Sequence, residues 1–519
     1  MKCLKLCLVL LLLTATGAAT IRAADSGGIL LARVHFAGSR ALGQSTNGSR
    51  LAKIWALPES VQLQERVMQK LARAPEQLLA GRIENTGDHS ALLRPLLDDC
   101  LASESVCEWK EQAGRQSFSL AIQLDPDRAS LWNTNLGQLF RSWKIDPRPG
   151  KSGWNTGWFR FSQHPRWVVV SIGINAAQSS RFDLEIEKGG RPSAALTTNC
   201  FAATIDWPLL EKSLPLGSSP LKLARTEIAV SLQANDLRTV IRATYPQAHG
   251  WKFETWAFPS NIVHDPLVSF TASQKLGLFL NESKLFQRAG LNPFSGQLFF
   301  WSRAEVPFES LAAMPVKNAG QILQQVATRM TNEFNPELRR AKAGELNWQT
   351  NSSQLVWQGL PPVVVPFLGA YKGKSGEVLL GGLFPLLPGT NPPPKELVAQ
   401  FISRRDLVYY DWEITQERLT QWRILDQVYA IVTMTAKGGM SGMPASGNFL
   451  DLPGQKWMFA LAPLLGNAAT EITSTGPNEV RFTRKSHSGF SSVELLLISK
   501  WLHHPAFPLF GFRLPTMPQ

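Results

Sequence analysis

The chain has 519 residues, of which 44% are hydrophobic and 18% charged, a balance typical of a globular protein with room for more than one domain. Its net charge is +13, but the basic residues are spread along the chain and form no long basic run. This distribution argues against a nucleic-acid-binding arm, so nucleic acid is not expected as a partner.

Residues 1–23 are predicted to be a cleavable signal peptide. Lys2 and Lys5 precede an apolar run over Leu6–Leu13, and small residues follow it. This order of zones directs export, and cleavage is expected between Ala19 and Ala24. The apolar run is much shorter than the roughly 20 residues that cross a bilayer, and no later stretch is long enough. We therefore expect a periplasmic or extracellular protein with no transmembrane segment in the mature chain.

Strands and helices alternate in the N-terminal part of the chain. A strand is predicted at Ile29–Phe36, and three helices follow at Ser49–Trp55, Ser60–Arg73 and Ala91–Ser103. Apolar and polar residues alternate over Ser117–Leu124, as in a half-buried strand. The next helix opens at Asp125-Pro126, a cap residue followed by proline. Its apolar stripe has helical spacing and consists of Ala129, Trp132, Leu136, Leu139 and Trp143.

The mature chain carries three cysteines, Cys100, Cys107 and Cys200. An exported protein is permitted disulfides. Cys100 and Cys107 can pair only if their helix ends near Ser103 and the chain turns back, because seven helical positions are about 10 Å apart. Three inert, buried thiols are the alternative, and the sequence leaves both open.

The remainder of the chain contains further strand and helix patterns. A hairpin is predicted from Trp158–Phe161 and Trp167–Ile172, joined through Gln163-His164-Pro165. Further strands are predicted at Phe201–Ile205, Leu221–Leu232, Thr239–Thr244, Val268–Ala272, Gln297–Trp301, Val378–Leu383 and Leu407–Trp412. Further helices are predicted at Ala319–Met330, Gln416–Val432 and Ser491–His503.

Proline and glycine mark the breaks between regions. We predict an N-terminal α+β lobe over residues 24–213, a middle α+β region over 214–375, a C-terminal α+β lobe over 376–504, and a Pro- and Phe-rich tail over 505–519. Frequent hairpin signals and an irregular order of elements favour an α+β fold with antiparallel sheets covered by helices over a parallel α/β fold.

Two strand–helix segments resemble each other. The sequence Asp127-Arg128-x-x-x-Trp132 follows the strand at Ser117–Leu124, and Glu417-Arg418-x-x-x-Trp422 follows the strand at Leu407–Trp412. A hairpin is predicted after each, and 290 positions separate the two arginines. This internal repeat suggests two related lobes. Chance similarity between two amphipathic helices is the alternative.

Each motif with a known chemistry also has a structural explanation. Gly373-Lys374-Ser375 resembles the end of a phosphate-binding loop, but Leu368 stands where the pattern requires glycine, and a hairpin turn is favoured. His264-Asp265-Pro266 suits half of a general-base pair, yet a turn is favoured. No His-Glu-x-x-His pair is present, and His503 and His504 are predicted to lie at a helix C-terminus. We assign no catalytic, cofactor-binding or metal-binding residue and no cofactor.

Two carboxylate pairs and the many tryptophans are the remaining candidates. Asp98 and Asp99 are predicted to form the solvated side of a helix. Asp411 and Glu413 are two apart on a strand and share one face, which suits a glycosidase-like or cation site, a polar strand face or a helix start. There are 17 Trp against 5 Tyr, and four tryptophans outside helix stripes are candidates for an exposed sugar-stacking platform, namely Trp154, Trp158, Trp251 and Trp256.

Three segments of the sequence carry a resemblance to known proteins. Ile54-Trp55-Ala56-Leu57-Pro58, Leu93-Arg94-Pro95-Leu96-Leu97-Asp98-Asp99 and Tyr409-Tyr410-Asp411-Trp412-Glu413-Ile414-Thr415 resemble pieces of large exported bacterial proteins of unknown function. The resemblance implies no activity and no catalytic residues.

Two functional hypotheses follow. The first is a non-enzymatic exported protein that acts by binding or assembly, with polysaccharide or an envelope protein as its partner. The second is an exported hydrolase acting on envelope or polysaccharide substrates. A pocket that collects Asp411, Glu413 or His264 with exposed tryptophan would favour the hydrolase, whereas an exposed apolar patch would favour binding.

Overall fold

The computed structural model divides the chain into two compact units. Unit 1 is Met1–Pro246 with Leu497–Gln519, and unit 2 is Gln247–Leu496. The structure describes residues 28–79, 87–112, 115–173, 180–192, 199–213, 225–275, 284–290, 296–304, 309–360, 364–373, 375–384, 386, 389, 391–436, 453–504 and 507–508. The predicted signal peptide lies outside these residues, as do Lys374 and most of the tail.

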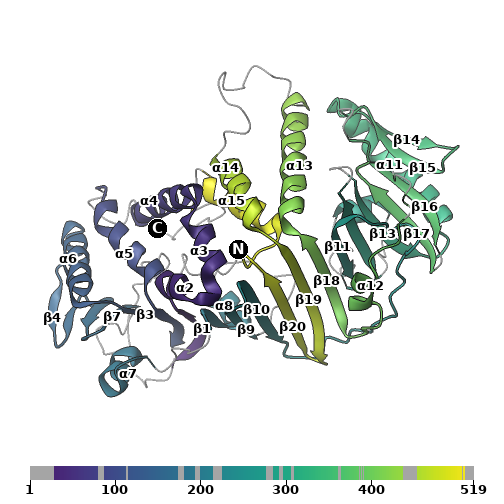
Figure 1. Ribbon diagram of the computed structural model, residues 1–519. Helices are drawn as coiled ribbons and strands as arrows, with labels where there is room; N and C mark the ends of the chain where they lie inside the picture. Colours follow the sequence, from purple (N-terminus) through teal and green to yellow (C-terminus); the bar gives the residue numbers. More distant parts are fainter. Residues whose placement is uncertain are drawn as a thin grey trace. The chain divides into compact units, whose positions relative to one another are not determined.

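Unit 1 contains an antiparallel sheet (Figure 1). Its strands are β1 (Ile29–Phe36), β2 (Ser105–Gln112), β3 (Arg115–Gln123), β4 (Arg148–Gly150), β5 (Gly153–Asn155), β6 (Phe159–Gln163), β7 (Trp167–Gly173), β8 (Phe201–Asp206), β9 (Arg225–Gln233) and β10 (Asp236–Thr244). In space they follow the order β10–β9–β8–β1–β2–β3–β7–β6–β5–β4.

The helices of unit 1 occupy the connections between these strands. Between β1 and β2 lie α2 (Ser39–Gln44), α3 (Ser49–Ala56), α4 (Pro58–Leu79) and α5 (Ser90–Ala102). Helix α6 (Pro126–Ser142) follows β3, α7 (Arg181–Gly189) precedes β8, and α8 (Trp207–Ser213) follows it. Helix α6 begins as predicted, because the Asp125 side chain accepts a hydrogen bond from the Arg128 backbone N–H and Pro126 occupies the first turn.

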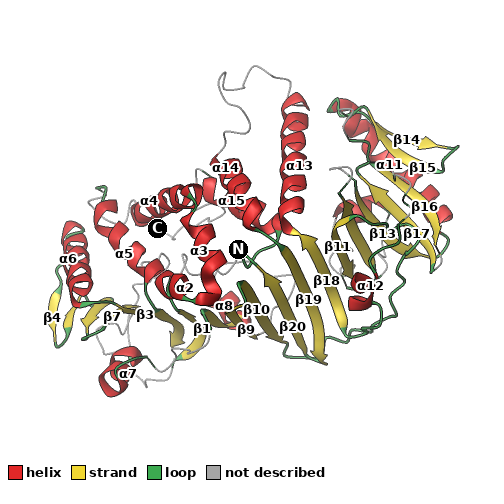
Figure 2. Cartoon of the chain, viewed as in Figure 1, coloured by secondary structure: helices red, strands yellow, loops and turns green. Residues whose placement is uncertain are grey.

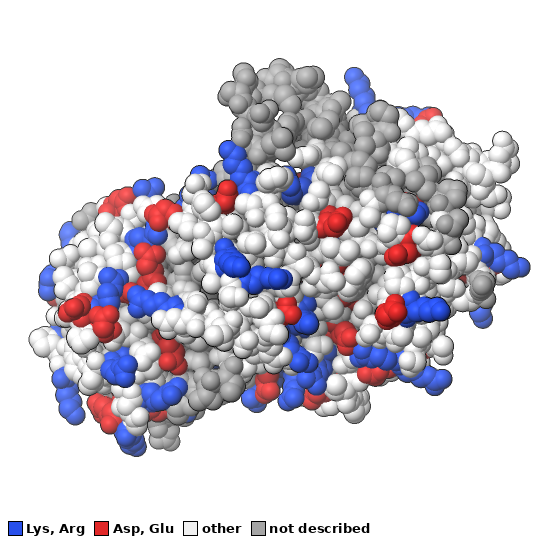
Figure 3. Space-filling view, viewed as in Figure 1, with Lys and Arg blue, Asp and Glu red and all other residues white. Residues whose placement is uncertain are grey.

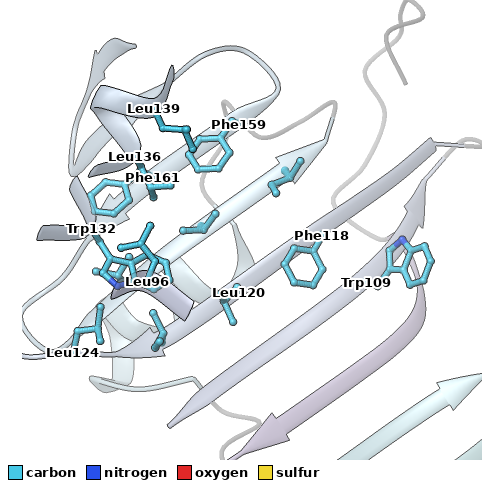
Figure 4. Close-up of a cluster of buried hydrophobic side chains, with 14 of the residues drawn as sticks. Leu96, Trp109, Phe118, Leu120, Leu124, Trp132, Leu136, Leu139, Phe159 and Phe161 are labelled. Carbon is cyan, nitrogen blue, oxygen red and sulfur yellow. The ribbon is translucent and has the colours of Figure 1, made fainter. Parts of the chain in front are cut away.

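The main core of unit 1 lies between the sheet and α5 and α6 (Figure 4). Alternate residues of β3, such as Phe118 and Leu120, face this core because side chains on a strand point to opposite sides in turn. The predicted stripe of α6 faces them through Trp132, Leu136 and Leu139. On the other face, α7 packs on a smaller cluster made of Val106, Ala121, Trp167, Val169, Phe182 and Ile186.

Unit 2 contains a second antiparallel sheet. Its strands are β11 (Leu267–Ser273), β12 (Leu298–Arg303), β13 (Ser310–Val316), β14 (Glu345–Gln349), β15 (Gln354–Gln358), β16 (Phe367–Gly373), β17 (Gly376–Gly382), β18 (Leu407–Ile414), β19 (Asn467–Gly476) and β20 (Glu479–Ser486). Their spatial order is β20–β19–β18–β11–β12–β13–β17–β16–β15–β14.

Helices cover both faces of the second sheet. They are α10 (Lys284–Ala289), α11 (Ala319–Arg340), α12 (Lys395–Phe401), α13 (Thr415–Ala436), α14 (Pro453–Leu461) and the start of α15 (Ser492–His503), whose residues from Leu497 onward belong to unit 1. Phe401 of α12 packs with Phe270 and Phe299 in an aromatic core on one face. Leu323 of α11 packs on Met314 and other residues of the opposite face. Polar side chains of β18 also lie on that opposite face.

The two sheets have the same strand order. When strands are counted from the first in each unit, the order is 10-9-8-1-2-3-7-6-5-4 in both. A helix follows the third strand in each unit (α6 and α11), and a helix precedes the eighth (α7 and α12). The internal repeat predicted from the sequence does not match this order, because Arg128 follows the third strand of unit 1 and Arg418 follows the eighth strand of unit 2.

The expected fold class of α+β, with antiparallel sheets covered by helices, is confirmed (Figure 2). The expected region boundaries do not coincide with the two units. Residues 375 and 376 fall in the hairpin where Gly373 pairs with Gly376, and β8 and β9 pair across the boundary expected after residue 213. Glycine and proline signal turns, and a turn inside a sheet has the same local sequence as a turn between domains.

The three described cysteines are not joined in disulfide bonds. Helix α5 ends at Ala102 and β2 begins at Ser105, so the chain does turn back as a Cys100–Cys107 bridge would require. Cys100, Cys107 and Cys200 nevertheless form no disulfide bond among the described residues, and burial raises the pKa of Cys100 to about 12. All three side chains are half-buried, so the expectation of buried thiols is met only in part.

Candidate functional site on strand β18

The two carboxylates predicted to share a strand face do so in the middle of the unit 2 sheet. Strand β18 lies between β11 and β19, and Asp411 is opposite Thr271 and Thr470. Glu413 is opposite Ser269, while Trp412 between the two carboxylates packs against the aromatic core on the other face. We refer to Asp411, Glu413 and Arg418 of α13 as the β18 site.

Glu413 holds the start of a helix. Its carboxylate accepts hydrogen bonds from the Ser492 backbone N–H at 2.7 Å and from the Ser492 hydroxyl at 2.6 Å, and the side chain is 5% exposed. Ser492 is the first residue of α15, so the carboxylate lies at the positive end of the helix dipole. Of the alternatives left open by the sequence, an anion at the start of a helix is the one that fits Glu413.

Asp411 has a different environment. It accepts a hydrogen bond from the Thr271 hydroxyl at 2.7 Å and keeps partial access to solvent. Burial, together with the negative charge of Glu413, raises the pKa of Asp411 to about 6, although Thr271 and two arginines act in the opposite direction. A carboxyl group with such a pKa exchanges its proton near neutral pH, as general acids do.

Arg418 approaches the two carboxylates from α13. Its side chain is 2% exposed and donates hydrogen bonds from Nη1 to the Ser310 hydroxyl at 3.2 Å and to Gln421 Oε1 at 2.8 Å. Its Nη2 is buried and has no hydrogen-bond partner among the described residues. Burial lowers the pKa of Arg418 to about 10, and the charges of Glu413 and Asp411 oppose that shift.

Aromatic rings flank the arginine. The guanidinium carbon lies 4.3 Å from the ring centroid of Trp422, one helical turn further along α13, and 5.6 Å from that of Phe300 on β12. Such contacts are favourable for a desolvated cation. The Arg-x-x-x-Trp spacing identified in the sequence thus produces a stacked pair in unit 2.

A second arginine near the site is held by residues other than the two carboxylates. Arg484 of β20 donates from Nε to the Thr470 hydroxyl at 2.9 Å and from Nη1 to Glu494. Glu494 also accepts a hydrogen bond from the Ser491 backbone N–H at 2.9 Å. Arg484 and Glu494 therefore fix the start of α15 beside Glu413, and they neutralise each other.

The turns predicted from the sequence are confirmed. His264 Nδ1 lies 3.1 Å from the Asn391 carbonyl oxygen, and Asp265 accepts a hydrogen bond from the Leu267 backbone N–H at 3.0 Å. Residues 373 and 376 close the hairpin of β16 and β17, and α15 ends at His503 as expected. None of these residues is part of the β18 site.

The prediction for Asp98 and Asp99 was right for the first and wrong for the second. Asp98 is 42% exposed and pairs with Arg94 one turn earlier. Asp99 is 3% exposed and accepts hydrogen bonds from Arg128 Nη2 at 2.8 Å and from Trp132 Nε1 at 2.9 Å. The packing of α6 on α5 buries Asp99, and no local sequence pattern reports that contact.

The prediction of an exposed tryptophan platform is wrong for Trp154 and Trp256. Trp154 is 9% exposed and donates to the Asn133 side chain, and Trp256 is 4% exposed and donates to the Arg404 carbonyl. Trp154 lies on β5 and packs against Phe140 of α6 and Phe161 of β6, whereas Trp256 lies in an irregular segment that packs on the aromatic core of unit 2. Trp158 packs against the unit 1 core, and Trp251 stacks on the His249 ring at 4.3 Å.

A buried Ser–His–Asp cluster in unit 1 was not anticipated. Asp183 Oδ1 lies 2.9 Å from His164 Nε2, and its Oδ2 accepts hydrogen bonds from the Ser180 backbone N–H and hydroxyl. Burial alone would raise the pKa of Asp183, but these bonds and Arg160 hold it below its usual range. Asp183 lies between the serine and the histidine, so the cluster is a helix capping box and lacks the order of a catalytic triad. The spacing Ser180-x-x-Asp183 is the sequence signal that would have identified it.

Within the described residues, no three His, Cys, Asp or Glu side chains are grouped so as to hold a metal ion. None of the described helices has both the length and the apolar character needed to cross a membrane. On the face shown in Figure 3, basic and acidic side chains are intermixed, in agreement with their spread along the sequence.

Comparisons with known proteins leave the family open. No protein-family model matches the chain, and no curated protein matches it. The solved structure of TP0453 in crystal form I is similar at a TM-score of 0.21, with 11% sequence identity, over 44% of this chain and 79% of that chain. A likeness at this level carries no argument about function.

Proposed function

We propose that this chain is an exported protein that acts in the periplasm or at the cell surface through binding or assembly. The observation that carries the proposal is the engagement of Glu413. Hydrolysis of glycosides generally needs two available carboxyl groups. At the β18 site Glu413 is bound twice by Ser492, so Asp411 is left without a second free carboxylate.

Exposed apolar side chains in unit 2 support a binding role. Phe459 of α14 is 67% exposed, Phe490 just before α15 is 41% exposed, and Val493 in the first turn of α15 is 37% exposed. Large apolar groups at the surface favour contact with another molecule. The export part of the proposal rests on the signal-peptide pattern of residues 1–23.

We also propose that the two units are related lobes that arose by duplication of one unit. The shared strand order and the helices in matching connections support this relation. An experimental structure of the mature chain tests it. The ten strands of one lobe are expected to superpose on those of the other in the order given above, and a different order in either lobe would contradict the proposal.

Hydrolysis is the second candidate function, and one observation favours it. The raised pKa of Asp411 and its partial access to solvent suit a general acid. In this case Asp411 would donate a proton to the leaving group of an envelope or polysaccharide substrate.

A single experiment separates the two functions. The full chain is expressed with its N-terminus intact, recovered from the periplasmic fraction and sequenced from its N-terminus, with cleavage expected between Ala19 and Ala24. The product is then incubated with insoluble peptidoglycan or polysaccharide, and both co-sedimentation and release of soluble fragments are measured. A binding protein sediments with the polymer and releases nothing. Fragment release that is lost in Asp411→Asn and kept in Asp98→Asn would overturn the binding role in favour of hydrolysis.

A further inference from the structure

The polar face of unit 2 contains a cation with an unused hydrogen-bond donor. Arg418 is almost completely buried, its Nη1 serves Ser310 and Gln421, and its Nη2 has no partner among the described residues. A buried donor without an acceptor costs free energy, so an acceptor that becomes available nearby gains an advantage. The guanidinium already feels the charges of Glu413 and Asp411 without forming a direct ion pair with either.

Of the two carboxylates, Asp411 is the one that can accept a further hydrogen bond. Glu413 uses both oxygens to bind Ser492, whereas Asp411 accepts one hydrogen bond, from Thr271 through its Oδ1. Asp411 also keeps partial access to solvent, so a proton can leave it for water. When protonated, this group is a weak acceptor for a cation, and when ionised it is a strong one.

The other charged and titratable groups around Asp411 are already engaged. On β18 they are Glu413 and Tyr409, and burial raises the pKa of Tyr409, which keeps it neutral. Arg484 from β20 binds Thr470 and Glu494, and Glu494 in turn caps α15. The neighbours from β11 and β19 are the uncharged residues Thr271 and Thr470. The charge of Arg484 also lowers the pKa of Asp411, but Arg484 is held by Thr470, Gly489 and Glu494. Arg418 is the cation that has a buried donor without a partner among the described residues.

We propose that Asp411 and Arg418 form a proton-operated contact between the unit 2 sheet and α13. With Asp411 protonated, Arg418 stays on Ser310 and Gln421, and α13 is held against β13. When Asp411 gives its proton to water, its carboxylate attracts the unused Nη2 of Arg418 and competes with the Ser310 hydroxyl. The contact between α13 and β13 is then weakened, and the only covalent change is the transfer of the proton from the Asp411 carboxyl group to water.

The pKa of Asp411, raised to about 6 by burial and by Glu413, places this change close to neutral pH. Stacking on Trp422 limits how far the guanidinium can move, so the expected change is a local loosening of the first turns of α13. The inference concerns how unit 2 responds to protons and does not depend on the proposed binding function.

Hydrogen exchange of the full chain, followed by mass spectrometry and corrected for intrinsic exchange, tests the contact between about pH 5 and about pH 8. Peptides covering the start of α13 and β13 are expected to lose protection by about threefold or more as the pH rises, with a midpoint near the pKa of Asp411. Asp411→Asn is expected to remove this change. Asp98→Asn, a matched variant in unit 1, is expected to keep it.

A second variant keeps the test decisive if Asp411→Asn disturbs the fold. Glu413→Gln can still accept from Ser492 but carries no charge, so the midpoint is expected to move to lower pH, because the charge of Glu413 raises the pKa of Asp411. Protection of α13 that is independent of pH in the wild-type chain would overturn the proposal. A midpoint that is the same in the wild type and in Glu413→Gln would overturn it as well.

Discussion

Arg128 in unit 1 and Arg418 in unit 2 carry the same spacing to a tryptophan on their helices and have opposite surroundings. Arg128 makes bidentate contacts with Asp99, and Trp132 donates to the same carboxylate, so the charges are matched by direct bonds. Arg418 stacks on Trp422 and binds neutral oxygens, and its nearest carboxylates act on it without direct contact.

The difference shows that an Arg-x-x-x-Trp helix does not determine its own electrostatic role. In unit 1, Asp99 of α5 binds both the arginine and the tryptophan of α6 and so connects the two helices. In unit 2 the pair lies over a polar sheet face with two carboxylates, one engaged and one able to titrate. The following predictions test this contrast.

The largest effect is expected in unit 1, where Arg128 is paired directly with Asp99. Asp99→Ala leaves Arg128 without its carboxylate and Trp132 Nε1 without an acceptor, so the free energy of unfolding should fall by about 4 kcal/mol. Urea-induced unfolding of the full chain measures this loss. The neighbouring Asp98→Ala removes a surface pair and should cost less than about 1 kcal/mol. Equal losses of unfolding free energy in Asp99→Ala and Asp98→Ala would show that the buried contacts of Asp99 stabilise the chain no more than the surface pair of Asp98.

In unit 2, substitution of Asp411 is expected to give a gain in stability that depends on pH. Because the pKa of Asp411 rises from 3.8 to about 6 on folding, its protonated form favours the folded state, and this stabilisation is lost as pH rises from about 4 through about 6. Asp411→Asn cannot ionise. It should stabilise unit 2 by about 2 to 3 kcal/mol at pH 8 and leave it unchanged at pH 4.

Hydrogen exchange of the β18 amides at the two pH values measures that gain. A variant that is less stable than the wild type at pH 8 would show that ionised Asp411 is well compensated, as Asp99 is.

The smallest effects compare the two tryptophans. Trp132→Phe removes a hydrogen bond to a buried carboxylate and should cost about 1.5 kcal/mol. Trp422→Phe keeps a ring beside Arg418 and should cost about 0.5 kcal/mol. Urea unfolding of both variants gives the comparison, and a larger loss for Trp422→Phe would mean that stacking outweighs the hydrogen bond.

Local sequence patterns predicted the elements better than the contacts between them. The cap at Asp125-Pro126 and the stripe of α6 were sufficient to define that helix, because both act within a few residues. The shared face of Asp411 and Glu413 followed from strand alternation alone. These features depend on neighbours along the chain.

Contacts between distant segments were not predictable in this way. Asp99 and Asp98 are adjacent, and only the packing of α6 decides which of them is buried. The partner of Glu413 is 79 positions away at Ser492, and Arg418 reaches Ser310 across 108 positions. No spacing rule connects such residues, so the candidate site could be located on a strand but its chemistry could not be assigned.

The division of unit 1 into two stretches of chain has a consequence for the order of folding. Lys70 of α4 donates hydrogen bonds to the carbonyls of Leu502, His503 and His504 at 3.3, 3.5 and 3.1 Å. These carbonyls emerge from the ribosome only after residues 247–496. Unit 2 is one continuous stretch of chain, whereas unit 1 gains its last contacts only when synthesis is complete. A chain that stops early therefore lacks a part of its first unit.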